Sequence, residues 1–389
     1  MQNGTPRRWV LGAQYFLYFG GMGVYLPFFN LYCYRLGFSG LQIGTLSAVR
    51  SLVLILFSIV WGVLADRFQS RRPIYMACNF ASAGAWGFLL LTADFVWMLA
   101  IMIVYSIFYA PLIAFLEAFA MQALGKDKKR YGRLRAWGSL AFIVTVLVLG
   151  RLIETYSIKI ILSLILAGAW VQALTALAFP RLAEARRRAF GVGLNRLLRA
   201  RVLVFLLCGF LMLLSHGAYY AFFSIHLNRL GYDDVFVGLC WAVAVGAEII
   251  VMLFSEPIFG RLRYETVLSL SFAAAVLRWI GLWTTSSASG LLLLQVTHAM
   301  SYGTFHMASI LYMDSLAPDE AKTTGQAVNN AVSYGLGLMV GFMLSGWLYS
   351  RIGSSALFGI SGLFALAGGL IFQLFTYRTR QSPPTPVLK

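Results

Sequence analysis

Seven ionisable side chains lie inside stretches of the sequence that are otherwise almost entirely apolar. They are two carboxylates, three guanidinium groups and two imidazoles: Glu117, Glu248, Arg50, Arg135, Arg278, His298 and His306. Desolvation penalises the charged form of a carboxylate, and an imidazole changes charge near neutral pH, so both kinds of group can exchange protons. A guanidinium group binds carboxylates through two parallel hydrogen bonds. Such residues inside apolar segments predict a functional site that is lined by protein.

The apolar stretches themselves are long enough to cross a lipid bilayer. The chain has 389 residues, of which 60% are hydrophobic and 12% charged, and its mean hydropathy is +0.76. Runs of about 20 apolar residues, the length of a membrane-spanning helix, recur along the whole chain. The expected spans are 9–33, 41–65, 73–93, 96–121, 132–157, 158–179, 202–226, 235–258, 266–284, 290–314, 323–349 and 355–377. This length excludes an outer-membrane barrel, whose strands alternate in segments of about 10 residues.

The net charge of +17 is distributed as in a membrane protein and not as in a nucleic-acid-binding protein. Lys and Arg gather at the N-terminus, at the C-terminus and in every second loop between the expected spans. The opposite loops hold only Arg35, Lys159, Arg229 and Arg351. By the positive-inside rule both termini are cytoplasmic. The compact loops favour the inner membrane of a bacterium.

The sequence repeats weakly at an offset of half its length. Arg35-Leu36-Gly37-Phe38 recurs as Arg229-Leu230-Gly231-Tyr232, in both copies between a first and a second helix. We therefore expect two six-helix halves, 1–179 and 202–377, with a basic linker at 180–201 and a cytoplasmic tail at 378–389. Two parallel repeats with the substrate site at their interface are the plan of the major facilitator fold. The linker fits either a helix on the membrane surface or a solvated connection.

A second segment supports this fold. Residues 62–72 resemble the signature that the major facilitator superfamily carries between its second and third helices, with one inserted residue and Ser70 in place of a glycine. The resemblance implies that Asp66 and Arg67 act in gating. They are not expected to bind the substrate.

Helices 4 and 5 resemble those of the oligosaccharide–proton symporters, the lactose permease family. Glu117 begins an E-A-F motif, Arg135 follows 18 residues later, and Phe142 occupies the position of that family's sugar-stacking tryptophan. The resemblance implies that Glu117 and Arg135 bind the substrate as a pair. A buried structural ion pair between neighbouring helices is the alternative.

A broader resemblance, to the bacterial 3-phenylpropionate transporters, covers nearly the whole chain. The matching segments are 23–28, 131–142, 216–222, 247–248, 277–279 and 295–298, together with Arg50 and His306. Their order and spacing imply the fold firmly and the substrate more loosely.

The balance of buried charge favours an acidic substrate. The three arginines outnumber the two glutamates, so the site is positive by one charge before any histidine is protonated, and a carboxylate offsets that excess. Tyr219, Tyr220 and Phe142 offer apolar walls for an aromatic ring. Arg50, Glu117 and Arg135 complete the predicted substrate site.

A different set of residues is predicted to couple transport to protons. The lactose permease family keeps a proton-accepting glutamate on helix 10, where this sequence has Ser301. We expect Glu248 to carry the proton, with His298 as the second candidate and Arg278 as their partner. A permanent ion pair of Glu248 with Arg278 or Arg135 is the alternative. His306 fits better as a packing residue than as a functional one.

The predicted protein is thus a monomeric twelve-helix proton symporter that imports a small organic solute of the aromatic carboxylate class by alternating access. A sugar or nucleoside symporter is one alternative, and a receptor or scaffold that binds solute without moving it is another. No nucleophile–base motif, phosphate loop or metal-ligand spacing indicates an enzyme, a cofactor or a metal site. The four scattered cysteines do not indicate a disulfide.

Overall fold

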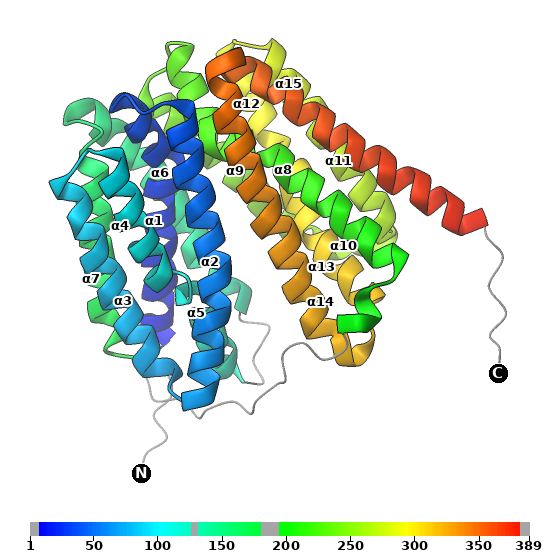
Figure 1. The fold of residues 1–389 in the computed structure, drawn as a ribbon, viewed down its shortest axis with the longest axis horizontal. Helices are drawn as coiled ribbons and strands as arrows, with labels where there is room; N and C mark the ends of the chain where they lie inside the picture. The colour runs from blue at the N-terminus through cyan, green and yellow to red at the C-terminus, as the bar shows by residue number, and fades with distance from the viewer. Residues whose placement is uncertain (1–7, 126–130, 180–193, 382–389) are drawn as a thin grey trace. The chain divides into compact units, whose positions relative to one another are not determined.

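A computed structural model describes residues 8–125, 131–179 and 194–381 (Figure 1). These residues form helices joined by short turns, and none of them lies in a strand. The first helices are α1 (Arg8–Arg35), α2 (Gly40–Phe68), α3 (Arg71–Gly87), α4 (Phe95–Tyr109), α5 (Leu112–Leu124), α6 (Tyr131–Thr155) and α7 (Ile160–Ala176). The later ones are α8 (Ala200–Arg229), α9 (Asp234–Leu253), α10 (Ser255–Arg261), α11 (Tyr264–Thr284), α12 (Ala288–Val296), α13 (Thr304–Leu316), α14 (Lys322–Asn329) and α15 (Leu338–Gln381).

Each of the twelve expected spans falls on one or more of these helices. Eight helical segments of the described residues are long and apolar enough to cross a membrane by themselves. The expected tenth span is divided into α12, a π-helical stretch and α13, and α7 has only 17 residues. The expected last two spans both run into α15, which bends at Gly353 where φ is 75°. The prediction of an all-helical membrane protein is confirmed.

Local sequence signals explain where several helices begin. Ser39 accepts a hydrogen bond from the backbone N–H of Gln42, whose side chain accepts one from the N–H of Ser39, a reciprocal cap on α2. Asp94 accepts hydrogen bonds from two backbone N–H groups at the start of α4. These side chains satisfy helix-end donors that would otherwise lack a partner.

The repeated Arg-Leu-Gly motif folds in the same way in both copies. Gly37 and Gly231 each adopt φ of +88°, a conformation that favours glycine. The backbone N–H of Phe38 donates to the carbonyl of Cys33, and that of Tyr232 donates to the carbonyl of Leu227, both at 3.1 Å. The two turns therefore end α1 and α8 with the same hydrogen bond.

The backbone divides into two compact units. The first comprises Met1–Arg188, Tyr220–Val245 and Phe342–Ser354, and the second Ala189–Tyr219, Gly246–Gly341 and Ser355–Lys389. These units group the helices by packing and so cut across the predicted halves, whose boundaries remain predictions. Most of the predicted linker, residues 180–193, lies outside the described residues.

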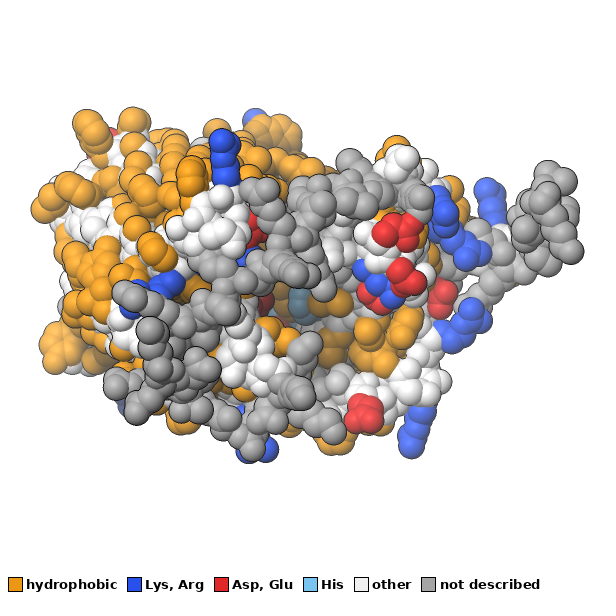
Figure 2. All heavy atoms as spheres, turned by 90° about the horizontal axis from the view of Figure 1, so that it is seen from below, with side chains coloured by type: hydrophobic (Ala, Val, Ile, Leu, Met, Phe, Trp, Pro, Cys, Tyr) orange, Lys and Arg blue, Asp and Glu red, His pale blue; other side chains and the backbone are white. Residues whose placement is uncertain are grey.

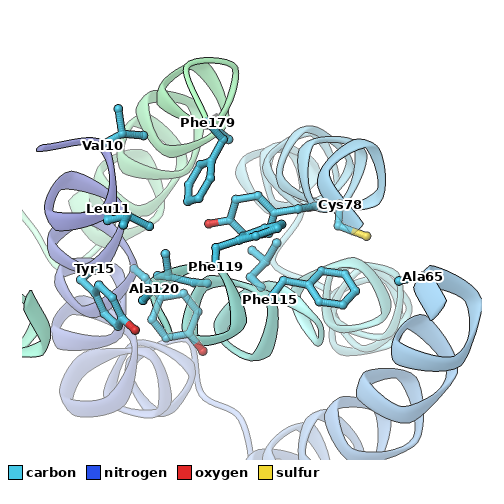
Figure 3. Packing of buried hydrophobic residues seen from close by; sticks show 14 residues of the cluster. Val10, Leu11, Tyr15, Ala65, Cys78, Phe115, Phe119, Ala120 and Phe179 are labelled. Carbon is cyan, nitrogen blue, oxygen red and sulfur yellow. The ribbon is translucent and has the colours of Figure 1, made fainter. Parts of the chain in front are cut away.

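The first unit packs around α1, which lies against α6 and α7. Aromatic residues of α1 and α5, among them Tyr15, Phe115 and Phe119, form a buried cluster with Phe179, which follows the end of α7 (Figure 3). Buried polar groups within this unit are bonded to one another. The hydroxyl of Tyr75 donates to Oε1 of Gln14 at 2.6 Å. This hydrogen bond joins the polar side chains of α1 and α3 in the interior of the unit.

The outward faces of many helices are apolar. Leu91, Leu253 and Leu293 are 80%, 76% and 68% exposed, and hydrophobic side chains cover wide areas of the face seen in Figure 2. A water-soluble protein rarely exposes apolar surface on this scale. The surface fits a protein that is surrounded by lipid.

Two glycines on α2 differ in what a methyl group would meet, which leads to a stability prediction. A Cβ on Gly44 would lie 2.6 Å from the carbonyl oxygen of Phe342 and 2.9 Å from Cα of Gly346, both backbone atoms. A Cβ on Gly62 would meet nothing within 4 Å. We expect Gly44→Ala to destabilise the protein by about 1–3 kcal/mol through overpacking. Thermal unfolding in detergent measures this as a lower Tm.

The matched control is Gly62→Ala. Alanine has the better helix propensity, so this variant should be neutral or more stable by about 0.5–1 kcal/mol. Equal Tm values for the two variants would contradict the close backbone approach at Gly44.

Candidate functional site

The second unit brings together the three predicted coupling residues. Glu248 lies on α9, Arg278 on α11, and His298 between α12 and the π-helical stretch η4 (Ala299–Gly303). Nε2 of His298 is 2.8 Å from Oε1 of Glu248, and Nδ1 of the same ring is 2.8 Å from Nη1 of Arg278. The imidazole therefore bridges a carboxylate and a guanidinium group. Arg278 is completely buried and His298 is 2% exposed.

The direction of these hydrogen bonds follows from the chemistry of arginine. A guanidinium group only donates, so Nδ1 of His298 must accept from Arg278. The proton of the neutral imidazole then lies on Nε2, which donates to Glu248. A second proton on the ring would point a donor at Arg278 and set two cations side by side. In this arrangement the carboxylate of Glu248 is the better acceptor for an additional proton.

Further contacts hold the guanidinium group of Arg278 in place. Its Nη2 donates to Oε1 of Gln295 at 3.1 Å, and the hydroxyl of Tyr219 donates to the same oxygen at 2.9 Å. The guanidinium carbon lies 4.1 Å from the centre of the Tyr219 ring and 4.8 Å from that of Trp279. Cation–π contacts of this kind orient a buried arginine without neutralising its charge. Tyr219, predicted as a substrate wall, thus contacts Arg278 and Gln295 in the second unit.

Two π-helical stretches lie in the second unit. The first, η4, begins directly after His298, and the second, η6 (Asn330–Gly337), lies between α14 and α15. A π-helical turn widens the helix locally and is frequent at functional sites. The ring of Tyr302 stacks on that of His298, with centroids 5.2 Å apart. The π-helical turn therefore lies beside the cluster.

His306 lies farther along the same helix and has its own partner. Its Nδ1 is 2.7 Å from the hydroxyl of Tyr334, and its ring stacks with that of Tyr302 at 6.1 Å. These contacts fit the packing role that we expected for His306.

The first unit holds Glu117 and Arg135 but does not join them in an ion pair within the described residues. The hydroxyl of Tyr131 donates to Oε1 of Glu117 at 3.4 Å. The guanidinium carbon of Arg135 lies 3.7 Å from the centre of the Phe19 ring. The structure therefore does not contain the direct ion pair between these two residues that was the alternative prediction. Their joint role in substrate binding remains a prediction.

The other predicted substrate residues are separated in the fold. Arg50 lies in the first unit, with its guanidinium carbon 4.2 Å from the centre of the Tyr25 ring. Phe142 is 5% exposed in the same unit. Tyr220 also belongs to the first unit, where its ring lies 6.2 Å from that of Trp241, whereas Tyr219 belongs to the second. The two adjacent tyrosines thus have different surroundings.

The predicted gating residues occupy the turn between α2 and α3. Oδ1 of Asp66 accepts hydrogen bonds from Nε and Nη2 of Arg71, at 3.2 and 2.7 Å. Arg67 instead lies beside the ring of Phe68, at 5.9 Å. Arg72 donates to the carbonyls of Leu177 and Phe179. Asp66 is therefore paired with Arg71 of the next helix, α3. The gating role of Asp66 and Arg67 remains a prediction.

One charged pair was missed in the sequence. Arg35, at the end of α1, donates to both carboxylate oxygens of Asp234, at the start of α9, at 3.0 and 2.8 Å. The signal was available, because Arg35 belongs to the repeated motif and Asp234 follows the second copy of that motif closely. The two residues are 199 positions apart, and nothing in the sequence pairs them directly.

Comparison with known proteins decides the family, since a model of the MFS_1 like family matches residues 8–360. The chain belongs to this family. It is 27% identical to a probable 3-phenylpropionic acid transporter of Escherichia coli (strain K12), over 92% of this chain and 95% of that protein. It is 24% identical to a maltose permease of Geobacillus stearothermophilus, over 97% and 96%. The crystal structure of the nucleoside transporter NupG superposes with a TM-score of 0.83 at 17% identity, covering 96% and 99%.

These findings confirm several predictions. The chain is a transporter of the major facilitator type with the corresponding all-helical membrane fold. The relatives and the structural neighbours are transporters, so the prediction that the chain is not an enzyme is also confirmed. The relatives include transporters of quite different solutes, and the family alone therefore leaves the substrate open.

Proposed function

We propose that the chain imports a small organic acid, of the aromatic carboxylate class, together with protons by alternating access. The observation that carries this proposal is the chain of contacts from the partly exposed Glu248 through the buried His298 to the buried Arg278. A carboxylate at this depth is costly to keep charged, so a role that requires its protonation accounts for its presence. The name of the relative from Escherichia coli supports the substrate class.

The charge of this cluster links the proton to the substrate. With Glu248 ionised, its negative charge balances that of Arg278, and the imidazole between them is neutral. With Glu248 protonated, the cluster carries one positive charge and attracts an anion. Proton binding and carboxylate binding therefore favour each other, which is the thermodynamic requirement for symport.

The proposal also includes the cellular location and the oligomeric state of the protein. Basic residues in alternate loops support cytoplasmic termini in a bacterial inner membrane. The proposed working unit is the monomer, with the lipid bilayer, protons and the solute as its partners.

Uptake into proteoliposomes tests the proposal. An imposed pH gradient, acid outside, should drive accumulation of labelled 3-phenylpropionate above the equilibrium level, because each entering proton carries the anion with it. A protonophore should abolish the accumulation. A sodium gradient in place of the pH gradient should not drive accumulation. Accumulation that ignores the protonophore would show that protons are not the coupling ion.

A sugar or nucleoside is the second candidate, and Glu117 favours it. Its carboxylate already accepts a hydrogen bond from the hydroxyl of Tyr131, the geometry in which an acid binds a hydroxyl group. The maltose permease relative and the likeness to NupG are consistent with such a solute. Uptake of maltose or uridine without uptake of organic acids would decide for this alternative.

A further inference from the structure

The structure points to Arg50 and the cavity beside it as the receptor for the carboxylate group of the substrate. We infer that this receptor makes the transporter prefer acids to neutral solutes. The inference rests on the proposed function, in which the charge of the Glu248–His298–Arg278 cluster links proton and anion, and it assigns direct contact with the carboxylate group to Arg50. All of the residues involved belong to the first unit.

The cavity lies between the helices of this unit and is large enough for one small polar group. Its volume is about 30 Å³, and Arg50, Tyr18, Tyr25, Asn79, Tyr105 and Tyr109 contribute to its lining. One water-sized sphere takes up roughly 10–15 Å³ on this measure, so the space fits about two such spheres. A carboxylate group has two oxygen atoms, and the aromatic ring of an acid would have to lie outside the cavity.

Arg50 differs from the other two membrane arginines in its neighbours. Arg278 is linked through His298 to Glu248, and Arg135 is close enough to Glu117 to interact with it electrostatically. Arg50 instead lies among tyrosines: its guanidinium group is over the ring of Tyr25 and near that of Tyr109, and Tyr18 and Tyr105 line the same cavity. Within the described residues Arg50 forms no ion pair with a carboxylate. A partly buried positive charge without a carboxylate partner is stabilised when an anion joins it.

The cavity presents donors that have no acceptor. Nε of Arg50 and Nε2 of Gln172, another lining residue, are buried and have no hydrogen-bond partner within the described residues. The polar contact of Arg50 Nη2 is the sulfur atom of Met22 at 3.9 Å, a weak acceptor. An ionised carboxylate only accepts hydrogen bonds, so it complements this set of donors. A sugar hydroxyl would complement it less well, because it brings a donor of its own.

Aromatic rings hold the guanidinium group in place for such a ligand. Its carbon atom lies 4.2 Å from the centre of the Tyr25 ring and 5.8 Å from that of Tyr109. Tyr109 in turn stacks on Tyr18 and on Tyr105, with centroids 5.2 and 5.0 Å apart. These contacts fix the orientation of Arg50 and leave its charge uncompensated.

The test compares an acid with its neutral amide. The affinities of the purified full-length protein for 3-phenylpropionate and 3-phenylpropanamide are measured by calorimetry. The wild-type protein should prefer the acid, and Arg50→Gln should lower the affinity for the acid by about tenfold or more, the effect of losing hydrogen bonds to a charged group. Affinity for the amide should change little. Arg151→Gln is the matched control, since Arg151 is 79% exposed on α6 and should leave both affinities unchanged.

A second variant covers the case in which the loss of Arg50 disturbs folding. Arg50→Lys keeps the positive charge but lacks the paired N–H donors of a guanidinium group, so it should retain a preference for the acid at reduced affinity. An unchanged preference for the acid in Arg50→Gln, or unchanged acid affinity in Arg50→Lys, overturns the inference while leaving the proposed function intact. A wild-type protein that neither binds nor accumulates aromatic acids refutes the proposed function itself.

Discussion

Replacing Glu248 by glutamine is expected to reduce proton-driven uptake to the level of protein-free liposomes. Glutamine has nearly the same shape, and its side-chain oxygen can still accept the hydrogen bond from Nε2 of His298. The variant should therefore fold. It cannot release or take up a proton, so its cluster stays in the positive state that attracts the anion. Uptake driven by an imposed pH gradient measures the loss.

The same variant should keep the steps that do not involve the proton. Exchange of labelled for unlabelled substrate at equal pH should continue, because the loaded carrier can still reorient. Wild-type affinity for the anion should fall as the pH rises, since deprotonation of Glu248 removes the favourable charge. The affinity of Glu248→Gln should not depend on pH.

The matched control is Glu154→Gln. Glu154 pairs with the exposed Arg151 on α6 and lies outside the cluster, so its uptake should equal that of the wild type. Full proton-driven uptake by Glu248→Gln would show that another group carries the proton. His298 would then be the next residue to replace.

Much of the fold was predictable because a bilayer constrains a chain strongly. Every backbone polar group in the hydrocarbon must be satisfied within the protein, so a long apolar run has to be a helix. The repeated turns also followed from sequence, since Gly37 and Gly231 occur in the same motif and both adopt φ of +88°. Such features depend on local sequence and on the surrounding lipid.

The irregular parts of the helices were not predictable in this way. The π-helical stretches η4 and η6 lie within the expected spans 290–314 and 323–349, each of which was expected as one continuous helix. The extra residue in a π-helical turn is stabilised by what packs around it, as the ring of Tyr302 does against His298. A pattern of residue types contains little information about that packing.

The candidate site was predicted by composition more than by geometry. Glu248, Arg278 and His298 were grouped from their chemistry and from the resemblance to known transporter families, and the structure brings them into contact. The order of the contacts, with the imidazole in the middle, could not be read from the sequence. Arg50 was grouped with Glu117 and Arg135 for the same reason, yet it lies among tyrosines because α2 turns that side chain toward α1 and α4. The rotation of each helix about its axis decides these contacts, and it depends on the whole bundle.

Replacing Arg278 by methionine is expected to have the largest effect on stability. Arg278 is completely buried, and its removal leaves Glu248 and Gln295 without their cationic partner. Removing one partner of a buried ion pair costs about 3–5 kcal/mol, and we expect a loss toward the lower end, because Glu248 is 16% exposed and is linked to Arg278 through His298. Methionine fills a similar volume, so the loss reflects charge more than a cavity. Thermal unfolding in detergent should show a marked decrease of Tm, and uptake should be absent.

A double variant separates this charge effect from simple loss of packing. Adding Glu248→Gln to Arg278→Met removes the uncompensated negative charge of Glu248, so the double variant should be more stable than Arg278→Met alone. The expected coupling energy is about 0.5–3 kcal/mol, typical of residues in one network. Uptake should remain absent, since the proton carrier is also gone. If the double variant were less stable than either single variant, the two charges would not be balancing each other through His298, and the proposed link between proton and anion would lose its basis.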